Sequence, residues 1–552
     1  GLRPSSPTAM KLLHVLLALA ALAPAEAWVP RSALRPASRR VLPTAAVSSP
    51  AAADVEQIPS SAVTRFRKGV KQVATLGPKS FSKEMIEKLF IAGVDVFRLN
   101  LSHGAEDKLE PAQTIRELEA KYGRPIGVLI DIQGPKHRVG MFPNPNEGTK
   151  VSLTKGQSYT FDLNTDEEGD DTRVSLPHPE VLEALEVGHR VLIDDGKMTV
   201  TVTEKGEGWV KTEVMNDATI SSRKGFNLPD TYVPGSALTP KDLEDLDYCL
   251  KNIDFDWVAL SFVQQKEDIE QLRKLMGDHP AKVLAKIEKP LAIDNLESIV
   301  DVCDGIMVAR GDLGVEMFPE DVPMLQKDII DECRLQGKPV IVATQMLESM
   351  IDNPAPTRAE CSDILTAIFD GADAVMLSGE SAAGKYPEES VAMQQKVISR
   401  VESDKRWLAR EPDAIAGDGT FSDALMKSAT QLSRTMKAKA MIVLTESGLS
   451  VIRASRERPD MPILAVTPNP EVARALTLMK HVYPVVMDPK DYGEAIFEHA
   501  VEAAKNLKLV DSPEDILICT AGLPHGTAGA ANIIQVISAE AGKPPVGTKI
   551  GN

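Results

Sequence analysis

The hydrophobic positions of this chain gather into eight short apolar runs that are separated by amphipathic stretches. Most of the runs do not alternate with polar residues and are rich in β-branched side chains, which is typical of parallel strands buried on both faces. Helical patterns, such as those over residues 82–92 and 265–276, lie between most of them. Eight strand–helix units predict an α/β protein built on a (β/α)8 TIM barrel. The runs are residues 71–76, 94–101, 126–132, 256–263, 283–288, 305–311, 339–345 and 374–380.

Two segments that do not follow this alternation of strands and helices predict two further domains. Residues 133–255 are too long for a loop and contain short alternating strands with glycine and aspartate turns, which indicates a small inserted β-barrel domain that could close as a lid. After a polar connector, four strand patterns separated by helices predict an open, mainly parallel α/β sheet. These four patterns are residues 440–445, 462–467, 482–487 and 515–520. The predicted domains are the barrel (64–135 and 236–404), the inserted lid (136–235) and the C-terminal domain (405–552).

Ionisable and polar side chains recur where the barrel strands end, which is the face that carries the sites of such barrels. Glu288 and Asp312 follow neighbouring strands and could together hold one hard divalent cation. Lys286 precedes Glu288 by two residues, so both side chains leave the strand on the same face. A surface salt bridge is the plainer interpretation, but Gly311 beside Asp312 favours close approach of a ligand. Further strand-end groups are Arg98, Asn100, Asp131, Ser261 and Thr344.

The net charge of -17 argues against nonspecific binding of nucleic acid or of anionic membranes. An anionic substrate must therefore be attracted by local basic residues. The five cysteines are scattered and form no CxxC pair, which predicts reduced thiols and no zinc site.

The first 60 residues have the composition of a targeting segment, and we expect them to lie outside the folded domains. Met10 resembles a translation start, and the apolar run 12–23 before a small-x-small cleavage site at 25–27 indicates a signal peptide over about 10–27. Residues 28–55 are rich in arginine, as a transit peptide is. This arrangement resembles the bipartite presequences of complex plastids; secretion, another organelle or the cytosol are the alternatives.

Eight motifs occur in the order and spacing of one family, and from Thr64 to near the C-terminus the chain resembles the pyruvate kinases. The motifs are RLNLSHG (98–104), DIQGPKHR (131–138), KGFNLP (224–229), AKIE (285–288), DGIMVARGDLGVE (304–316), ATQMLESM (343–350), PTRAE (356–360) and DGADAVMLSGE (370–380). The resemblance implies transfer of the phosphoryl group of phosphoenolpyruvate to ADP, which gives pyruvate and ATP. It also implies a homotetramer.

The resemblance assigns a role to each residue of the predicted site. Glu288 and Asp312 would bind Mg²⁺ or Mn²⁺, and Lys286 and Arg98 would hold the transferring phosphoryl group. The backbone amides of Gly311 and Asp312, with the Thr344 hydroxyl, would hold the substrate carboxylate, and Thr344 would then pass on a proton. The positions that match nucleotide contacts are Asn100, His103, Arg138 and Lys224.

The third-strand motif departs from the members of the family that require K⁺. Their K⁺ site uses the positions of Asn100, Ser102 and Asp131, together with a threonine hydroxyl and a nearby glutamate. Here the threonine position is Ile132 and the glutamate position is Lys136, whose tethered ammonium can replace the ion. We therefore expect that K⁺ is not required. The plainer interpretation is that Lys136 points to solvent.

The C-terminal domain contains a candidate effector site where a strand ends and a helix begins. The family implies a phosphorylated activator there, with residues 522–532 as the opposing loop. Glu446 and Leu449 stand where activator-binding relatives often carry basic side chains, so we expect the phosphorylated effector to bind weakly. The alternative is a relic site that no longer binds an effector. The candidate effector residues are Thr445, Ser447 and Ser450.

Two other classes of protein remain open at this point. A different barrel enzyme that forms an enolate, such as an aldolase or lyase acting on pyruvate, would also use two carboxylates and a base, but it has no use for the lid, Arg138 or Lys224. A catalytically dead sensor would need a lost site residue, and the sequence shows none.

Overall fold

The computed structural model describes residues 68–144, 149–488, 496–522 and 531–540. The predicted presequence therefore lies outside the described residues. Within them, no helix is both long enough and apolar enough to cross a membrane. All five cysteines are free thiols, as their scattered positions predicted.

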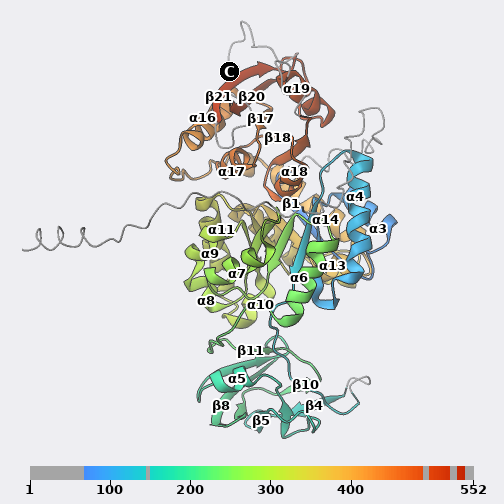
Figure 1. Ribbon diagram of the computed structural model, residues 1–552, viewed down its shortest axis with the longest axis vertical. Coiled ribbons are helices and arrows are strands. Elements are labelled where there is room, and N and C mark those ends of the chain that lie inside the picture. The colour runs from blue at the N-terminus through green and yellow to red at the C-terminus, as the bar shows by residue number, and fades with distance from the viewer. Residues whose placement is uncertain (1–67, 145–148, 489–495, 523–530, 541–552) are drawn as a thin grey trace, which may run out of the picture. The chain divides into compact units, whose positions relative to one another are not determined.

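Eight parallel strands close into a barrel, which confirms the predicted fold (Figure 1). The first strand pairs with the last through Lys71 and Ala374, so the ring has no open edge. Every residue of β12, β14, β15 and β16 is buried, which explains why these strands appear in the sequence as unbroken apolar runs. The strands are β1 (Lys71–Leu76), β2 (Val96–Asn100), β3 (Gly127–Ile132), β12 (Trp257–Leu260), β13 (Lys282–Ile287), β14 (Gly305–Ala309), β15 (Val340–Ala343) and β16 (Ala374–Leu377).

Helices surround the barrel and bury their apolar faces against it (Figure 1). Local signals set where several of them begin: for example, Thr357 and Glu360 form a capping box at the start of α12. The helices are α3 (Lys83–Ala92), α4 (Leu109–Tyr122), α6 (Pro240–Asn252), α7 (Lys266–Met276), α8 (Pro290–Asp294), α9 (Leu296–Val302), α10 (Arg310–Glu316), α11 (Val322–Gln336), α12 (Arg358–Asp370), α13 (Gly379–Ala382), α14 (Pro387–Glu402) and α15 (Lys405–Leu408). Short 3-10 turns cover Leu101–His103, Glu106–Lys108 and Glu348–Ile351.

The lid domain inserted after β3 is mainly β-structure, as predicted, with one short helix, α5. In place of one closed β-barrel, its hydrogen bonds form a six-stranded sheet, β11-β7-β8-β9-β5-β6, and a two-stranded sheet, β10-β4. Both sheets contribute to one core that includes Tyr159, Phe161 and Ile220. The elements are β4 (Lys150–Leu153), β5 (Ser158–Asp162), β6 (Arg173–Ser175), α5 (Pro179–Ala184), β7 (Arg190–Ile193), β8 (Met198–Gly206), β9 (Trp209–Val214), β10 (Ala218–Ser221) and β11 (Phe226–Asn227).

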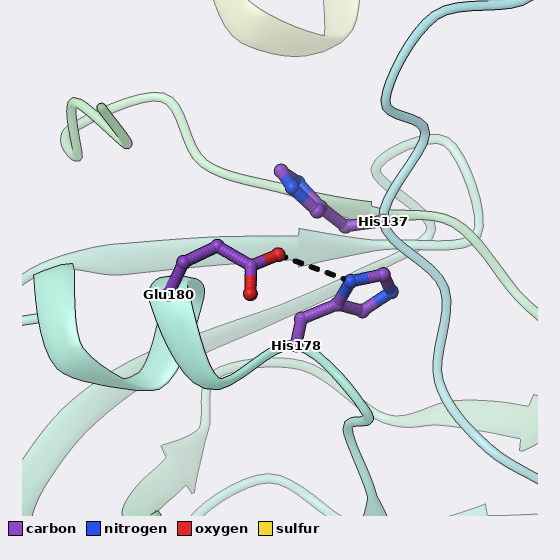
Figure 2. Close-up of side chains that lie close together, drawn as sticks. All are labelled: His137, His178 and Glu180. Carbon is purple, nitrogen blue, oxygen red and sulfur yellow. Dashed lines mark ion pairs between the residues drawn. The ribbon is translucent and has the colours of Figure 1, made fainter. Parts of the chain in front are cut away.

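The two chain segments that connect the barrel to the lid are joined by backbone hydrogen bonds. Val139 N donates to Lys224 O at 3.0 Å, and Phe226 N donates to His137 O at 3.0 Å. Gly134 begins the first connection with a φ of 71°, and a Cβ there would lie 2.8 Å from the Phe262 ring, so glycine is required. The side chain of His137 on this connection lies beside two lid residues (Figure 2).

The C-terminal domain is a five-stranded sheet in the order β19-β18-β17-β20-β21. The first four are the predicted parallel strands. The fifth, β21, runs antiparallel to β20 and was not predicted, because at an edge its partly exposed positions give no continuous apolar run. The strands are β17 (Ala440–Leu444), β18 (Ile463–Thr467), β19 (Val482–Val486), β20 (Ile516–Gly522) and β21 (Ala531–Ser538), and the helices are α16 (Phe421–Met436), α17 (Leu449–Arg456), α18 (Pro470–Ala475), a 3-10 turn Leu476–Leu478 and α19 (Ile496–Asn506).

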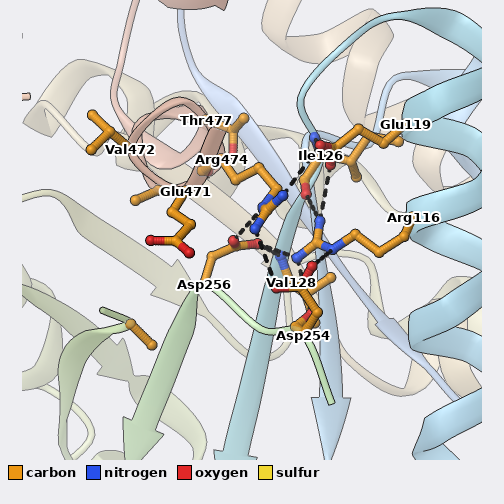
Figure 3. Close-up of polar contacts among 12 residues, drawn as sticks. Arg116, Glu119, Ile126, Val128, Asp254, Asp256, Glu471, Val472, Arg474 and Thr477 are labelled. Carbon is orange, nitrogen blue, oxygen red and sulfur yellow. Dashed lines mark hydrogen bonds and ion pairs between the residues drawn. The ribbon is translucent and has the colours of Figure 1, made fainter. Parts of the chain in front are cut away.

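The N-terminal end of the barrel contacts the C-terminal domain through a buried ionic network (Figure 3). Asp256, just before β12, accepts from Arg116 Nη2 at 2.8 Å, from Arg474 Nε at 2.7 Å and from Val128 N at 2.8 Å. Leu478 packs into the apolar cluster inside the barrel. The N-terminal end of the barrel is therefore closed by apolar packing and ion pairs. These contacts stabilise the fold, whereas the polar site residues lie at the opposite end.

Candidate active site

Lys286, near the end of β13, lies among three oxygen-bearing side chains from neighbouring strands. Its ammonium donates to Ser261 Oγ at 2.7 Å and lies 3.0 Å from Glu288 Oε1 and 3.4 Å from Asp131 Oδ1. Burial opposes the charge, but the carboxylates of Asp131 and Glu288 outweigh it and raise the pKa of Lys286 above its ordinary value. The side chain is therefore a fixed, buried positive charge.

Arg98, from β2, is held beside Lys286 by the same buried carboxylate. Arg98 Nε donates to Asp131 Oδ2 at 2.6 Å, and Arg98 Nη1 donates to Thr75 Oγ1 at 2.9 Å. Although burial favours protonation of Asp131, Arg98 and Lys286 hold its pKa below the ordinary value. The carboxylate of Asp131 thus positions both Arg98 and Lys286 at the face where the barrel strands end.

Glu288 and Asp312 provide oxygen donors that fit a divalent cation. Glu288 Oε2 accepts from Phe262 N at 2.8 Å, and the buried Oε1 is ion-paired with Lys286 at 3.0 Å. Burial raises the pKa of Glu288, Lys286 lowers it, and the nearby Asp312 raises it again, so the net direction is upward. Two neighbouring carboxylates match the oxygen-donor set of Mg²⁺ or Mn²⁺.

Thr344 and Gly311 are joined by a hydrogen bond between adjacent strand ends. Gly311 N donates to Thr344 Oγ1 at 2.7 Å, and that hydroxyl donates to Ala343 O at 2.6 Å. Thr344 has a φ of 68°, a strained conformation for a β-branched residue. Arg310 Nη2 donates to Thr344 O at 2.8 Å and Arg310 also binds both oxygens of Asp363, which holds the strained turn in place.

The cleft beside these strand ends has a volume of about 600 Å³ and is lined by residues of the barrel and the lid, among them Lys136 and Asp312. Lys136 Nζ lies 3.5 Å from Asp312 Oδ1, and the two side chains are only 28% and 30% exposed. Lys136 is therefore partly buried and ion-paired with Asp312. Asn100 Oδ1 accepts from Ser102 N at 3.1 Å and from Ser102 Oγ at 2.8 Å.

The remaining predicted residues lie away from this cluster. Arg138 and Lys224 lie together on the lid connections, where Arg138 donates to Arg223 O and Lys224 pairs with Asp194 at 2.8 Å. The side chain of His103 is outside the described residues.

At the predicted effector position β17 ends and α17 begins, as expected. Thr445 Oγ1 accepts from Gly448 N at 2.9 Å, Ser447 is exposed and Ser450 is buried. Most of the opposing loop, residues 523–530, lies outside the described residues.

The residues that were not predicted from the sequence form hydrogen bonds that hold the predicted site residues in place. Thr75 ends the first strand and could have been found from its position there, as Asp131 and Ser261 were. The Phe262 amide and the Arg310–Asp363 pair gave no such signal, because a backbone donor and a partner on α12 are invisible to a local pattern.

The barrel and its site define a class of enzyme: a (β/α)8 barrel with a β-rich lid, whose paired carboxylates and buried cations suit metal-dependent chemistry on an anionic substrate. Comparison with known proteins specifies the family. The description "Pyruvate kinase, barrel domain" matches residues 67–391, and "Pyruvate kinase, alpha/beta domain" matches residues 423–537. The chain belongs to the pyruvate kinase family.

Individual relatives agree with this assignment. The chain is 46% identical to a pyruvate kinase of Methylorubrum extorquens over 84% of its own length and 96% of the relative's. It is 40% identical to pyruvate kinase 2 of Synechocystis over 84% of the chain and 78% of the relative. A crystal structure of a pyruvate kinase from Cryptosporidium parvum has a TM-score of 0.78 and 32% identity, and covers 87% of this chain and 97% of its own.

Proposed function

We infer that this site transfers the phosphoryl group of phosphoenolpyruvate to ADP and releases pyruvate and ATP, the reaction of its family. One observation carries the inference: two cations, the buried Lys286 and the partly buried Arg98, share Asp131 beside the carboxylates of Glu288 and Asp312. Phosphoryl transfer depends mainly on positioning and on fixed charges around the transferring group, and this arrangement supplies both.

The roles of the residues follow from what each can offer. Lys286 and Arg98 bind the phosphoryl oxygens, and because Asp131, Ser261 and Thr75 already hold them, little reorganisation is needed on binding. Glu288 and Asp312 would hold Mg²⁺ or Mn²⁺, and a bound cation supplies neutralisation of charge on the phosphate and on the enolate oxygen.

Residues at the neighbouring strand ends bind the substrate carboxylate and deliver the final proton. The amides of Gly311 and Asp312 open α10, where the helix dipole favours an anion. The Thr344 hydroxyl is anchored there by Gly311 and relays a proton, through water, to the methylene carbon of the enolate. Asn100, His103, Arg138 and Lys224 bind the nucleotide, and closure of the lid excludes water and so suppresses hydrolysis.

The direct test is a coupled assay of the purified protein with phosphoenolpyruvate and ADP. We expect pyruvate and ATP in equal amounts, only with a divalent cation present, and no turnover in Glu288→Gln. Pyruvate that forms equally well without ADP would contradict the proposal and would favour a lyase or aldolase.

We propose further that K⁺ is not required, because the ammonium of Lys136 occupies the role of that ion. Two unit charges about 4 Å apart interact by about 4 kcal/mol at an effective dielectric constant of 20, so K⁺ beside this ammonium would be repelled. The proximity of Lys136 to Asp312 supports a position within the charged site.

Wild-type protein should be fully active in tetramethylammonium buffer, and Lys136→Glu should be several-fold less active there and recover when K⁺ is added. Steady-state rates at constant ionic strength measure both. A matched control is Lys211→Glu, which changes the same charge on the lid at a lysine paired with Glu204. A several-fold activation of the wild type by K⁺ would refute the proposal.

A phosphorylated effector is proposed for the turn that includes Thr445, Ser447 and Ser450. Their hydroxyls and the amides at the start of α17 could hold a single phosphate group. We expect one of fructose bisphosphate, glucose 6-phosphate, ribose 5-phosphate or AMP to change the apparent KM for phosphoenolpyruvate, and Ser450→Ala to weaken that change. A flat response to all four would identify a relic site.

The proposed location is a complex plastid, reached through a signal peptide and a transit peptide. A fluorescent fusion of residues 10–60 is expected to reach the plastid by way of the secretory pathway. Replacement of Trp28, the aromatic residue directly after the predicted signal-peptide cleavage site, should divert it. Fluorescence in the cytosol would refute this.

A homotetramer is proposed from the family, and a sedimentation mass of one or two chains would refute it.

A further inference from the structure

His137, His178 and Glu180 form a cluster of metal-binding side chains that the proposed reaction does not use (Figure 2). Their candidate ligand atoms all lie within 4.8 Å of one another. His137 lies on the connection into the lid, whereas the other two lie at the start of α5 in the lid itself. The cluster therefore joins two segments that are distant in the sequence.

The contacts of the cluster leave one of its histidines without a hydrogen-bond partner. His178 Nδ1 lies 3.3 Å from Glu180 Oε1, and Arg138 N donates to His178 Nε2 at 3.3 Å. His137 makes only an edge contact with the His178 ring, with centroids 4.9 Å apart, and its ring nitrogens bind nothing among the described residues. His137 is half-buried, and its ring nitrogens are not among the buried unpaired polar atoms of the described residues, so they are open to a ligand from solvent.

The charges around the cluster are compatible with a cation. The nearby ammonium of Lys289 would repel a cation, but it is neutralised by Glu316 at 2.6 Å. Glu180 is largely exposed and contributes a negative charge.

The donor set selects the kind of metal. Two imidazoles and one carboxylate are a common ligand set for Zn²⁺, whereas Mg²⁺ and Ca²⁺ prefer oxygen ligands. In a tetrahedral Zn²⁺ site with ligand distances of about 2.0–2.2 Å, the donor atoms lie about 3.3–3.6 Å from each other. The ligand atoms of the cluster lie within 4.8 Å of one another, so binding requires side-chain movements of up to about 1.5 Å, and the exposed Glu180 is the side chain most able to move.

We propose that His137, His178 and Glu180 form a second metal site, for a borderline divalent cation such as Zn²⁺, that ties the lid connection to α5. This site differs from the oxygen-donor pair Glu288 and Asp312 in ligand type and in place. A bound ion would restrict the segment that carries Arg138, and so would stiffen the lid where it leaves the barrel.

The test is calorimetric titration of the full, metal-free chain with Zn²⁺ in the presence of excess Mg²⁺, which occupies the oxygen-donor site. We expect one equivalent to bind, and His137→Gln, His178→Gln and Glu180→Gln each to weaken binding by at least about tenfold, since loss of even an outer-shell partner costs 10–100-fold. The matched control is His189→Gln, a lid histidine bonded to Thr231 outside the cluster, which should bind as the wild type does.

Two further measurements address folding and mechanics. Thermal unfolding of each variant without metal shows whether the fold is intact, and Glu180→Gln, at an exposed position, is the variant least able to disturb it. Hydrogen exchange of the peptides around residues 136–140 and 178–184 should slow when Zn²⁺ binds the wild type. Unchanged Zn²⁺ affinity in His137→Gln or Glu180→Gln, or unchanged exchange in these peptides, would overturn the proposal.

Discussion

Replacement of Lys286 by methionine is expected to lower kcat by about a thousandfold, a barrier increase of about 4 kcal/mol. Methionine keeps the length of the side chain but removes the charge that lies 3.0 Å from Glu288 and 3.4 Å from Asp131. Arg98, the second cation assigned to the phosphoryl group, is held in place by Asp131 and Thr75 and so cannot move to the position of this ammonium. Transfer of the phosphoryl group would therefore lose its nearest buried cation.

Binding of the divalent cation should survive this change, because Glu288 and Asp312 are untouched and lose a competing positive charge. Single-turnover kinetics measure the transfer step, and electron paramagnetic resonance of Mn²⁺ measures metal binding. The matched control is Lys282→Met at the opposite end of β13, which should turn over at close to the wild-type rate. If Lys286→Met keeps more than about a tenth of the wild-type rate, a loss below about 1.4 kcal/mol, the role of Lys286 is wrong.

Removal of the Asp256 carboxylate is expected to cost about 3–5 kcal/mol in the free energy of unfolding. Its side chain is 1% exposed and binds Arg116 and Arg474 as charged partners. Asp256→Ala would leave two guanidinium groups without their shared buried carboxylate and the Val128 amide without its side-chain acceptor. The cost arises because both arginines lose their most buried partner and keep only the more exposed Glu119 and Asp254.

Asp254→Ala is the matched control, because Asp254 contacts the same two arginines but its side chain is 57% exposed. Its loss should cost no more than about 1 kcal/mol. Urea unfolding followed by a signal from the barrel, such as Trp257 fluorescence, measures both variants. Equal destabilisation by the two substitutions would show that burial does not decide the strength of this network.

The sequence located every strand of the barrel, and the reason is burial on both faces. A parallel strand surrounded by helices and by a barrel interior must be apolar at successive positions, so β12 and β14 stand out without any knowledge of their neighbours. The edge strand β21 does not meet that condition, since most of its residues are partly exposed, and it was missed.

The candidate site was predictable for a related reason. The carboxyl ends of parallel strands meet at one face, so Arg98, Lys286, Glu288 and Thr344 could be grouped without a structure. Their hydrogen bonds could not be predicted in the same way. That Thr75 holds Arg98, that the Phe262 amide holds Glu288 and that Arg310 holds the strained Thr344 turn depends on atoms placed by tertiary packing.

The sequence by itself determined the class of fold, the family and the identity of the strand-end residues, because each of these leaves a local pattern of burial, spacing or motif. Only the tertiary structure decided which groups are partners: Lys136 with Asp312, Asp256 with Arg474, and His137 with His178. Such pairs join segments that are distant in the chain. The interaction free energy of each pair depends on its burial and geometry, and both are determined by the tertiary fold. A local pattern records that a residue is polar, and the fold determines what that residue contacts.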